Sequence, residues 1–373
     1  MEVTVQNNSA FHYFKLMLDF VIKNAEVGIF CLVSFAISAL LIPIIIKVCE
    51  KHKLYDTTGG RKIHSGNIPR LGGLAFVLAY CTTALAYALI FHDWISSTIP
   101  FVLSGFIIFV FGFLDDIFNL RAILKLLVQV VAALIVVCSG FWFRNIGAIQ
   151  LPMVVGMTVT VLWIIGIINA FNLIDGMDGL CGGISVLIFL TLAVIYSISQ
   201  EKAAAMSLIL ASAVFGFLVY NKPKAKIFMG DGGSQFLGFM IATLPLYRTT
   251  ENFEYNKLFI MITLCSIPVL DCIAAIWRRT REHRSIMSAD RAHLHHKLLY
   301  LGLTVEQALF FVLLLQFCLG IICCLAMYLR SFNAVVLLFT AFTFISIIFG
   351  MIHFFYRTRM AEKHDTDHEE PAK

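Results

Sequence analysis

The sequence predicts an all-α, polytopic integral membrane protein with about 11 transmembrane helices, and three observations carry this prediction. Hydrophobic residues make up 60% of the 373 residues and charged residues only 14%, with a mean hydropathy of +0.87, whereas soluble domains carry about 25% charged residues. Apolar runs long enough to cross a bilayer as helices recur along the chain. Lys and Arg gather in alternate connections between these runs, as they do in cytoplasmic loops.

The apolar runs define 11 candidate spans, of which the eighth is short. They are residues 27–48, 71–91, 99–114, 122–139, 153–170, 183–199, 203–220, 234–247, 257–277, 306–329 and 333–355. Residues 11–22 are too short and too charged to span, so we expect a helix at the membrane surface there. The chain thus divides into an N-terminal periplasmic or interfacial segment at 1–26, a transmembrane domain at 27–356 and a cytoplasmic tail at 357–373. The tail is charged and has no apolar period, which predicts disorder.

The distribution of basic residues predicts the orientation of the chain in the membrane. Of the 28 Lys and Arg residues, 21 fall in connections on one side and seven on the other. The richer side is cytoplasmic by the positive-inside rule, which places the N-terminus outside and the C-terminus inside. The net charge of +5 then needs no nucleic-acid partner.

The polar clusters all lie on this predicted cytoplasmic side, in residues 49–70, 112–125, 169–183, 221–234 and 278–300. This asymmetry favours an enzyme face at the inner membrane surface. A transporter would place ionisable residues near span midpoints or show two related halves. A non-catalytic scaffold would not need Asp115, Asp116, Asn172 and Asp231 together.

The central polar cluster is the stretch Asn169–Gly183, between two apolar runs. Asn169, Asn172, Asp175 and Asp178 recur there every three residues, a spacing that drifts only slowly around one face of a helix. Several glycines follow and favour an irregular turn. Such a patch is costly between two membrane-length runs unless it lies in water or lines a cavity.

A pair of adjacent carboxylates, Asp115 and Asp116, ends an apolar span, and Lys125 lies at the start of the next. Two carboxylates beside a bilayer need a cation or a proton. A divalent metal, or a base that acts on a phosphate, would explain them. The alternative is a solvated helix end whose carboxylates pair with Arg121 or Lys125.

The glycine-rich stretch Phe228–Ser234 contains one acidic residue, Asp231, directly before a span. Glycine turns expose backbone N–H groups to phosphate oxygens, and an Asp there can hold Mg²⁺ against them. Phe228 beside such a turn can stack on a base. The alternative is an ordinary helix cap.

The last connection with unusual chemistry carries three histidines, His293, His295 and His296, after Asp290 and Arg291. Arg and His suit the oxygens of a diphosphate. The alternatives are a zinc site, which the short spacing disfavours, and a plain basic loop.

Two other polar positions are candidates with ordinary alternatives. Asp56 and Arg70 lie in a loop that is either a substrate rim or an ordinary basic loop. Asp271 follows Pro268 inside an apolar span, where it is either functional or a structural partner for Arg278 or an Asn.

Five motifs in order resemble the polyprenyl-phosphate N-acetylhexosamine-1-phosphate transferase family. They are LDD at 114–116 followed by Lys125, NAFNLIDGMDGL, FMGDGGS, PVLD at 268–271 and DRAHLHH. The match runs from about Leu54 to Leu299. The resemblance implies a bundle of about ten or eleven spans with an active site on the cytoplasmic face, so that 27–356 would be a transmembrane catalytic domain.

Within that family the chain looks like the bacterial WecA and TagO type, which uses UDP-N-acetylglucosamine. The related enzyme of peptidoglycan synthesis has different residues where this chain has His293-Leu294-His295-His296-Lys297 and Asn67–Gly73. These departures argue against a muramyl-pentapeptide substrate. They leave open N-acetylfucosamine or N-acetylgalactosamine donors, which relatives with the same motifs accept.

The resemblance implies the reaction of UDP-N-acetylglucosamine with undecaprenyl phosphate in the bacterial inner membrane, giving undecaprenyl-diphosphate-N-acetylglucosamine and UMP. This lipid-linked sugar would initiate a cell-surface polysaccharide. O antigen, a common antigen, teichoic acid and capsule all stay open as the polymer, and a homodimer is one option for the assembly. The implied cofactor is Mg²⁺, with Mn²⁺ as the alternative.

The resemblance also assigns roles to residues of this chain. Asn172 and Asp231 would hold the metal on the diphosphate, and Asp231 would count among the catalytic residues with Asp115, Asp116 and Lys125. Asp115 would orient or deprotonate the lipid phosphate, which Lys125 would bind. The implied substrate-binding residues are Asp56, Arg70, Asn169, Asp175, Asp178, Phe228, Arg291, His293, His295 and His296. We favour one-step attack by the lipid phosphate over an aspartyl-phosphate intermediate, because the nucleophile is already an anion.

Overall fold

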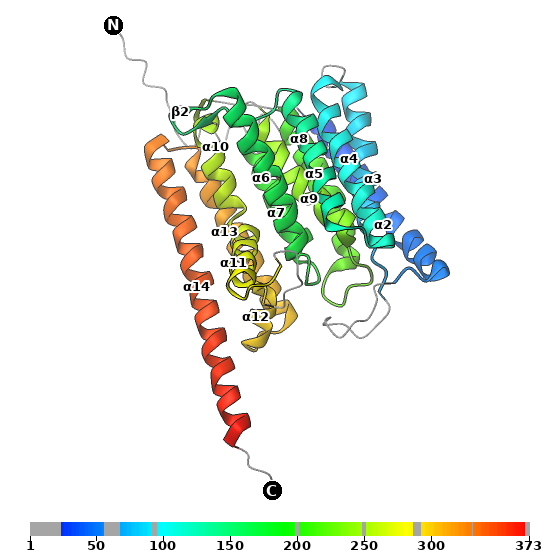
Figure 1. The fold of residues 1–373 in the computed structure, drawn as a ribbon. Coiled ribbons are helices and arrows are strands. Elements are labelled where there is room, and N and C mark those ends of the chain that lie inside the picture. Colours follow the sequence, from blue (N-terminus) through cyan, green and yellow to red (C-terminus); the bar gives the residue numbers. More distant parts are fainter. Residues whose placement is uncertain are drawn as a thin grey trace.

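The computed structural model describes residues 24–55, 68–91, 95–197, 201–247, 251–285, 292–329 and 331–369. They form a bundle of helices with one antiparallel hairpin, β1 (Asn145–Ile146) and β2 (Ile149–Gln150), at one end (Figure 1). The expected surface helix at 11–22 and the predicted site residues Asp56 and Arg291 lie outside the described residues.

Each expected span coincides with a helix or, in one case, with a bent pair. The helices are α2 (Ala25–His52), α3 (Gly73–Ile90), α4 (Ile95–Phe118), α5 (Ala122–Cys138), α6 (Met153–Ile174), α7 (Leu180–Ser197), α8 (Glu201–Asn221), α9 (Gly230–Thr243), the pair α10 (Glu251–Leu264) and α11 (Ser266–Arg281), α13 (Val305–Ala326) and α14 (Ser331–Glu369). The prediction of an all-α membrane protein is therefore confirmed.

The number of spans is less sharply defined than the fold class. In the described ranges, eight helices are long and apolar enough to span a bilayer, and the bent pair α10–α11 would be a ninth. The remaining two, α5 and α9, have 17 and 14 residues, short of the roughly 20 that a span needs. The count of 11 stays a prediction.

Two segments differ from the sequence prediction. The connection 278–300 contains a short helix, α12 (Leu294–Tyr300). Helix α14 continues to Glu369, whereas the sequence predicted disorder from residue 357. Met360, Ala361 and Glu362 are good helix formers, and adding a turn to an existing helix avoids the cost of nucleation, so α14 extends past its last apolar turn.

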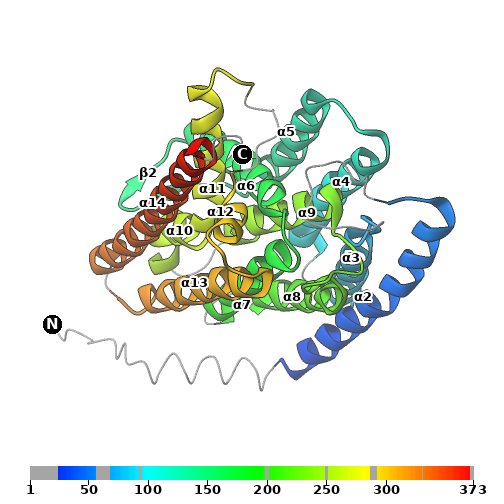
Figure 2. The same cartoon turned by 90° about the horizontal axis from the view of Figure 1, so that it is seen from below.

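Helix α9 lies at the centre of the bundle. It packs against α3, α4, α6 and α7, and Figure 2 shows it between α4 and α6. All of its residues except Asp231 are buried. A helix enclosed on every side by other helices need not match the full thickness of the bilayer. This explains how a helix as short as α9 can occupy the centre of the bundle.

Glycines bring α9 close to its neighbours. A Cβ at Gly112 of α4 would lie 2.4 Å from the Gly232 Cα, and a Cβ at Gly73 of α3 would lie 2.7 Å from the Gly233 Cα. Small residues at such crossings allow membrane helices to approach backbone to backbone. These contacts fix the first turn of α9 between α3 and α4.

The break between α10 and α11 bends the chain by 61°. Pro268 has no N–H group to donate to the Leu264 carbonyl one turn earlier, so that carbonyl loses its helical partner. The Gln316 side chain of α13 donates to it instead, at 3.0 Å. The broken helix is thereby satisfied inside the protein, as backbone at membrane depth must be.

Candidate active site

The predicted catalytic residues meet where α4 ends and where α5 and α9 begin, at the lower end of the bundle in Figure 1. The Lys125 Nζ pairs with the Asp115 carboxylate of α4 and lies 3.3 Å from the Asp231 Oδ2 of α9. The Asp115 side chain is only 5% exposed, whereas those of Lys125 and Asp231 are each 30% exposed. The fold thus joins three charged groups from three helices, two of them at a partly open surface.

Asp116 has a different environment from its neighbour Asp115. Its Oδ1 accepts hydrogen bonds from the Arg70 Nη2 at 2.8 Å and from the Asp231 backbone N–H at 3.0 Å, and its Oδ2 accepts one from the Gly232 N–H at 3.2 Å. The side chain is 2% exposed. Asp116 therefore caps the first turn of α9, and Arg70, predicted to line a substrate rim, also holds this cap.

The turn that precedes α9 requires glycine. Gly230 has a φ of +77°, a conformation that side chains disfavour. A Cβ there would lie 2.3 Å from the Arg70 carbonyl oxygen and 2.5 Å from the Asp116 Oδ2. Gly230 thus lets the backbone pass between Arg70 and Asp116 and present Asp231 beyond them.

Asn172, in the last turn of α6, is tied to the same helix. Its Nδ2 donates to the Ser234 hydroxyl at 3.1 Å, and that hydroxyl also lies 3.3 Å from the Asp231 carbonyl oxygen. With the amide nitrogen occupied, the Oδ1 is the atom of Asn172 that can bind a cation. Ser234, which sequence reasoning did not assign, links the two predicted metal ligands.

The cluster gathers four carboxylates, those of Asp115, Asp116, Asp175 and Asp231. Among the described residues, two cations pair with them, Arg70 and Lys125. Asp175 follows α6 directly, and loss of hydration in this crowded loop raises the pKa of its carboxyl to about 8. The negative charges of Asp231 and Asp116 raise it further. Even with Asp175 protonated, the carboxylates of Asp115, Asp116 and Asp231 outnumber the two cations, so the site has spare negative charge.

The residues of the site can be compared with the ligands that a divalent metal uses in proteins. No three or more His, Cys, Asp or Glu side chains form a metal cage in the part of the chain that the structure describes. Mg²⁺ bound with phosphates is usually held by one or two carboxylates, the phosphate oxygens and waters. Asp231, the Asn172 Oδ1 and the spare negative charge fit a site of that kind, completed by a substrate.

Further into the bundle than the carboxylates, a chain of amide side chains joins three helices. The Asn169 Nδ2 of α6 donates to the Gln129 Oε1 of α5 at 2.9 Å, and the Gln129 Nε2 donates to the Gln235 Oε1 of α9 at 3.2 Å. Asn169, predicted to bind substrate, is therefore held by a helix contact. Sequence reasoning missed Gln129 and Gln235, although each is a single polar residue within an apolar run.

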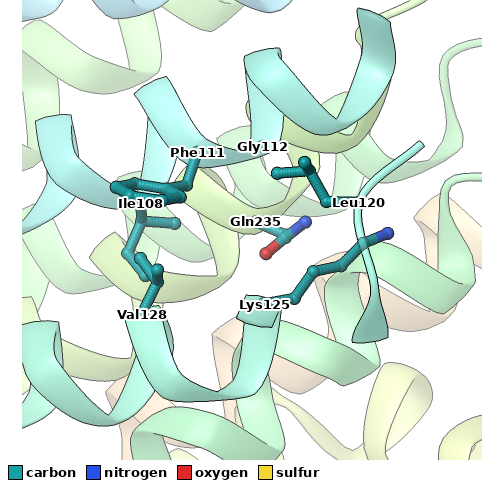
Figure 3. Close-up of a pocket in the computed structure, with 7 residues that line it drawn as sticks. All are labelled: Ile108, Phe111, Gly112, Leu120, Lys125, Val128 and Gln235. Atoms are coloured by element: carbon teal, nitrogen blue, oxygen red, sulfur yellow. The ribbon is translucent and has the colours of Figure 1, made fainter. Parts of the chain in front are cut away.

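A small cavity of about 10 Å³ adjoins this chain. Figure 3 shows the Lys125 stem and the Gln235 amide beside apolar side chains of α4 and α5. The residues that line it are Ile108, Phe111, Gly112, Leu120, Lys125, Val128 and Gln235. An apolar recess thus lies next to the stem of Lys125 (Figure 3).

Two of the predicted substrate-binding residues, Asp178 and Phe228, lie where the loop after α6 meets the connection before α9. The Asp178 Oδ2 accepts the Ala225 N–H at 3.0 Å, and the Asn221 side chain bridges the Gly179 N–H and the Ile227 carbonyl oxygen. The half-buried Phe228 is held through its backbone to Pro69 and Gly72. These contacts place Asp178 and Phe228 on two joined loops, and sequence reasoning missed Asn221.

The histidines of α12 lie against the loop that carries Asp175. A Cβ at Gly176 would lie 2.5 Å from the His295 Nε2. His295 is 1% exposed, and neither ring nitrogen has a hydrogen-bond partner among the described residues. Burial, with His296 and His293 nearby, lowers the pKa of His295 to about 3. The His296 ring lies 4.3 Å from that of His295.

Asp271 has a partner that the sequence did not predict. Neither Arg278 nor an Asn pairs with it among the described contacts; instead its Oδ2 lies 2.8 Å from the His293 Nδ1, and its Oδ1 accepts the Leu294 N–H at 2.8 Å. The expectation failed because α12 brings a histidine 22 residues away onto α11, a contact that local sequence does not encode.

Comparison with known proteins places the chain among membrane transferases. The model of the family described as glycosyl transferase family 4 matches residues 98–249, which include Asp115, Lys125, Asn172 and Asp231. A probable undecaprenyl-phosphate N-acetylglucosaminyl 1-phosphate transferase of Bacillus subtilis is 34% identical over 296 residues, covering 76% of this chain and 82% of that protein.

Two further relatives come from other bacteria. A decaprenyl-phosphate N-acetylglucosaminephosphotransferase of Mycolicibacterium smegmatis is 33% identical over 295 residues, covering 70% of this chain and 72% of that protein. An undecaprenyl-phosphate alpha-N-acetylglucosaminyl 1-phosphate transferase of Escherichia coli K12 is 29% identical over 275 residues, covering 70% and 73%. With its helical membrane fold and its cluster of acidic residues, this chain belongs to glycosyl transferase family 4, within the polyprenyl-phosphate N-acetylhexosamine-1-phosphate transferases.

Proposed function

We propose that this protein transfers N-acetylglucosamine 1-phosphate from UDP-N-acetylglucosamine to undecaprenyl phosphate and releases UMP. The product, undecaprenyl-diphosphate-N-acetylglucosamine, would initiate a cell-surface polysaccharide. The observation that carries the proposal is the Lys125 bridge between Asp115 and Asp231, because it sets a cation between two carboxylates beside an apolar recess. The names of the relatives support the lipid and the sugar.

The acceptor is a phosphate anion on a lipid tail that stays in the bilayer. Lys125 binds that phosphate, because its ammonium lies at the inner end of α5, at the depth of a lipid headgroup. Ile123, Leu124 and Leu127, which are exposed on α5 on either side of Lys125, give the first carbons of the tail an apolar surface. Asp115 holds Lys125 in place and orients the incoming phosphate.

In the reaction, an acceptor phosphate oxygen attacks the β-phosphorus of the donor. A new P–O bond forms, the bond from that phosphorus to the bridging oxygen breaks, and UMP leaves with that oxygen. Repulsion between two anions is the main barrier, and fixed cationic groups lower it. A bound Mg²⁺ would neutralise charge on the diphosphate, held by Asp231 and by the Asn172 Oδ1.

The donor binds on the loops that surround this cluster. Asp178 and Phe228 hold the uracil, Asp175 and Asn169 line the pocket, and the α12 histidines with Arg291 meet the phosphates. Because a nucleotide sugar is made in the cytoplasm, the site faces the cytoplasm, with the N-terminus outside. The excess of Lys and Arg in the connections on this side supports that orientation.

The test is a transfer assay on the purified protein in detergent with undecaprenyl phosphate, with UMP release as the readout. Separate reactions contain UDP-N-acetylglucosamine, UDP-N-acetylgalactosamine or UDP-N-acetylmuramyl-pentapeptide, each with Mg²⁺, with Mn²⁺ or with EDTA. We expect UMP from UDP-N-acetylglucosamine alone, and none in EDTA. Release from another donor only would overturn the sugar, and no release from any donor by folded protein would overturn the transferase.

A matched pair of variants ties the activity to this site. Asp231→Asn removes one carboxylate of the cluster and should abolish UMP release. Glu50→Gln removes an exposed carboxylate at the end of α2 and should leave it unchanged. Equal activity of both variants would contradict the placement of the site.

A further inference from the structure

The Asp271 carboxylate of α11 uses both of its oxygens on the start of α12. The Oδ2 meets the His293 Nδ1 and the Oδ1 meets the Leu294 backbone N–H, each at 2.8 Å. Asp271 is 1% exposed and His293 is 6% exposed. One buried carboxylate thus holds both the backbone and the side chain of the connection that carries the histidines.

The bond to His293 fixes which nitrogen carries the hydrogen. A carboxylate can only accept, so the Nδ1 must be the protonated nitrogen. In the neutral ring the Nε2 is then a bare acceptor, and in the charged ring it is a donor. The Nε2 has no hydrogen bond to any described residue, so it is the polar atom that His293 has left for a ligand.

The position of the ring places His293 next to His295, which lies against the proposed site. The His293 ring lies parallel to the His295 ring, with 6.0 Å between their centroids and 5° between their planes. His295 in turn contacts Gly176, the residue after Asp175. The ring that Asp271 orients therefore belongs to the layer of histidines that covers the Asp175–Asp178 loop.

We propose that Asp271 is a positioning residue for the transfer reaction. It holds His293 with the Nδ1–H toward α11, so that the Nε2 of the charged ring donates to a phosphate oxygen of the donor in the transition state. This inference rests on the proposed function, and it assigns to Asp271 a role separate from substrate contact. A buried carboxylate that orients a working histidine is a recurring arrangement, and losing it commonly costs 10-fold to 100-fold or more.

The Asp271→Asn variant separates the two bonds of the carboxylate. The amide oxygen can still accept the Leu294 N–H, so the anchor of α12 is kept. The amide nitrogen, in contrast, donates toward the Nδ1 and favours a neutral ring with the hydrogen on the Nε2, so the Nε2 can still donate but the positive charge of the ring is lost. We expect kcat for UMP release to fall by on the order of 10²-fold, with the KM for UDP-N-acetylglucosamine within about threefold of the wild type.

His293→Asn is the complementary variant, because its amide nitrogen can replace the Nδ1 as donor to Asp271 while nothing replaces the Nε2. It should lose as much kcat as Asp271→Asn. If Asp271 acts through His293, the double variant should be no slower than either single one, since groups that act as a unit are not additive. Glu282→Gln, which removes an exposed carboxylate at the end of α11, should keep wild-type kcat.

The deciding experiment combines this kinetic cycle with nitrogen NMR of the full-length protein in detergent, labelled with ¹⁵N-histidine. The His293 signals are assigned from their loss in His293→Asn. We expect a protonated Nδ1 in the wild type and its loss in Asp271→Asn. A wild-type His293 with hydrogen on the Nε2 alone, an Asp271→Asn variant with wild-type kcat, or multiplying losses in the double variant would each overturn the proposal.

These outcomes remain distinct from failure of the proposed function. If the wild-type protein releases no UMP from any donor, the transferase assignment falls whatever the NMR spectrum shows. If the wild type is active and only the Asp271 expectations fail, the transferase assignment stands and the positioning role does not.

Discussion

Asp116 accepts a hydrogen bond from the backbone N–H of Asp231, so a carboxylate at the end of α4 fixes the residue that the proposed metal would bind on α9. The two adjacent carboxylates near the end of α4 thus have different roles. Asp115 pairs with Lys125 at the site, whereas Asp116, 2% exposed, secures the helix that carries Asp231.

Replacing Asp116 should therefore affect structure and activity together. Asp116→Ala leaves the first N–H groups of α9 and the Arg70 guanidinium without their acceptor, which should cost about 2 kcal/mol of unfolding free energy and at least roughly 10²-fold in kcat. Asp116→Asn keeps one acceptor oxygen and should lose less of both. Thermal unfolding and UMP release measure the two effects; an Asp116→Ala protein with wild-type stability would refute the capping role.

Removal of the Lys125 charge should act on the lipid acceptor. Lys125→Met keeps the apolar stem but leaves Asp115 buried without its cation, so kcat/KM for undecaprenyl phosphate should fall by roughly 10²-fold to 10³-fold. Lys47→Met, which removes an exposed charge from α2, is the control and should be neutral. Equal kcat/KM values for the two variants would argue against phosphate binding by Lys125.

The contact between Gly112 and Gly232 should tolerate no added methyl group. In Gly112→Ala the new Cβ would meet the Gly232 Cα at 2.4 Å, so α4 and α9 must separate and both stability and UMP release should drop sharply. Gly166→Ala in α6 is the matched control, since nothing lies within 4 Å of its Cβ. Similar melting temperatures for the two variants would mean that the helices adjust freely.

Burial of neutral His295 should make stability depend on pH. Because burial lowers its pKa from 6.5 to about 3, the unfolded chain binds a proton between these values that the folded protein does not. His295 therefore destabilises the fold as pH falls below about 6.5, by about 1.4 kcal/mol per pH unit. The groups nearest to it are His293, His296 and Asp271.

His295→Gln should flatten this dependence between pH 7 and pH 5, whereas His52→Gln, at an exposed position on α2, should preserve it. Unfolding in detergent across this pH range provides the measurement. An unchanged slope in His295→Gln would show that other groups set the acid sensitivity.

The geometry of Asp115 favours direct transfer over a covalent intermediate. Its Oδ2 meets Lys125, and its Oδ1 accepts the Leu120 N–H at 2.7 Å, so each oxygen is already engaged and attack on phosphorus would compete with these contacts. We expect no exchange of labelled UMP into UDP-N-acetylglucosamine when the lipid is absent. Metal-dependent exchange without lipid would instead require an aspartyl-phosphate step.

Sequence patterns were sufficient for the helices of the bundle and singled out the charged residues that the structure brings together, but not α12, Ser234, Asn221, Gln129 or Gln235. Apolar runs mark every helix that forms the bundle, since a membrane helix must be apolar along its length. Asp115, Lys125 and Asp231 stood out because charges at the ends of such runs are costly. The short eighth span, α9, was the weakest prediction, and its central position explains its length.

Partnerships across the bundle could not be read from the sequence. That Asp116 caps α9, that Asp271 holds His293, and that Gln316 satisfies the Leu264 carbonyl all depend on which helices become neighbours. Each pairing joins residues far apart in the chain. The 3.6-residue period of a helix shows which face is buried but not which helix packs against it. The end of α14 was missed for another reason, since helix extension depends on propensity as well as on apolar pattern.

The Lys125 bridge has a consequence for how an acceptor enters. It lies one turn, about 5 Å, inside the ends of α4 and α5, where Asp115 is buried while Lys125 and Asp231 are partly exposed. The ammonium there already pairs with two carboxylates, so an arriving phosphate must compete with them for its positive charge. A neutral lipid headgroup cannot compete for the ammonium, and a weakly charged one competes poorly. Selection for a doubly charged headgroup would thus arise from competition within the protein, before any reaction begins.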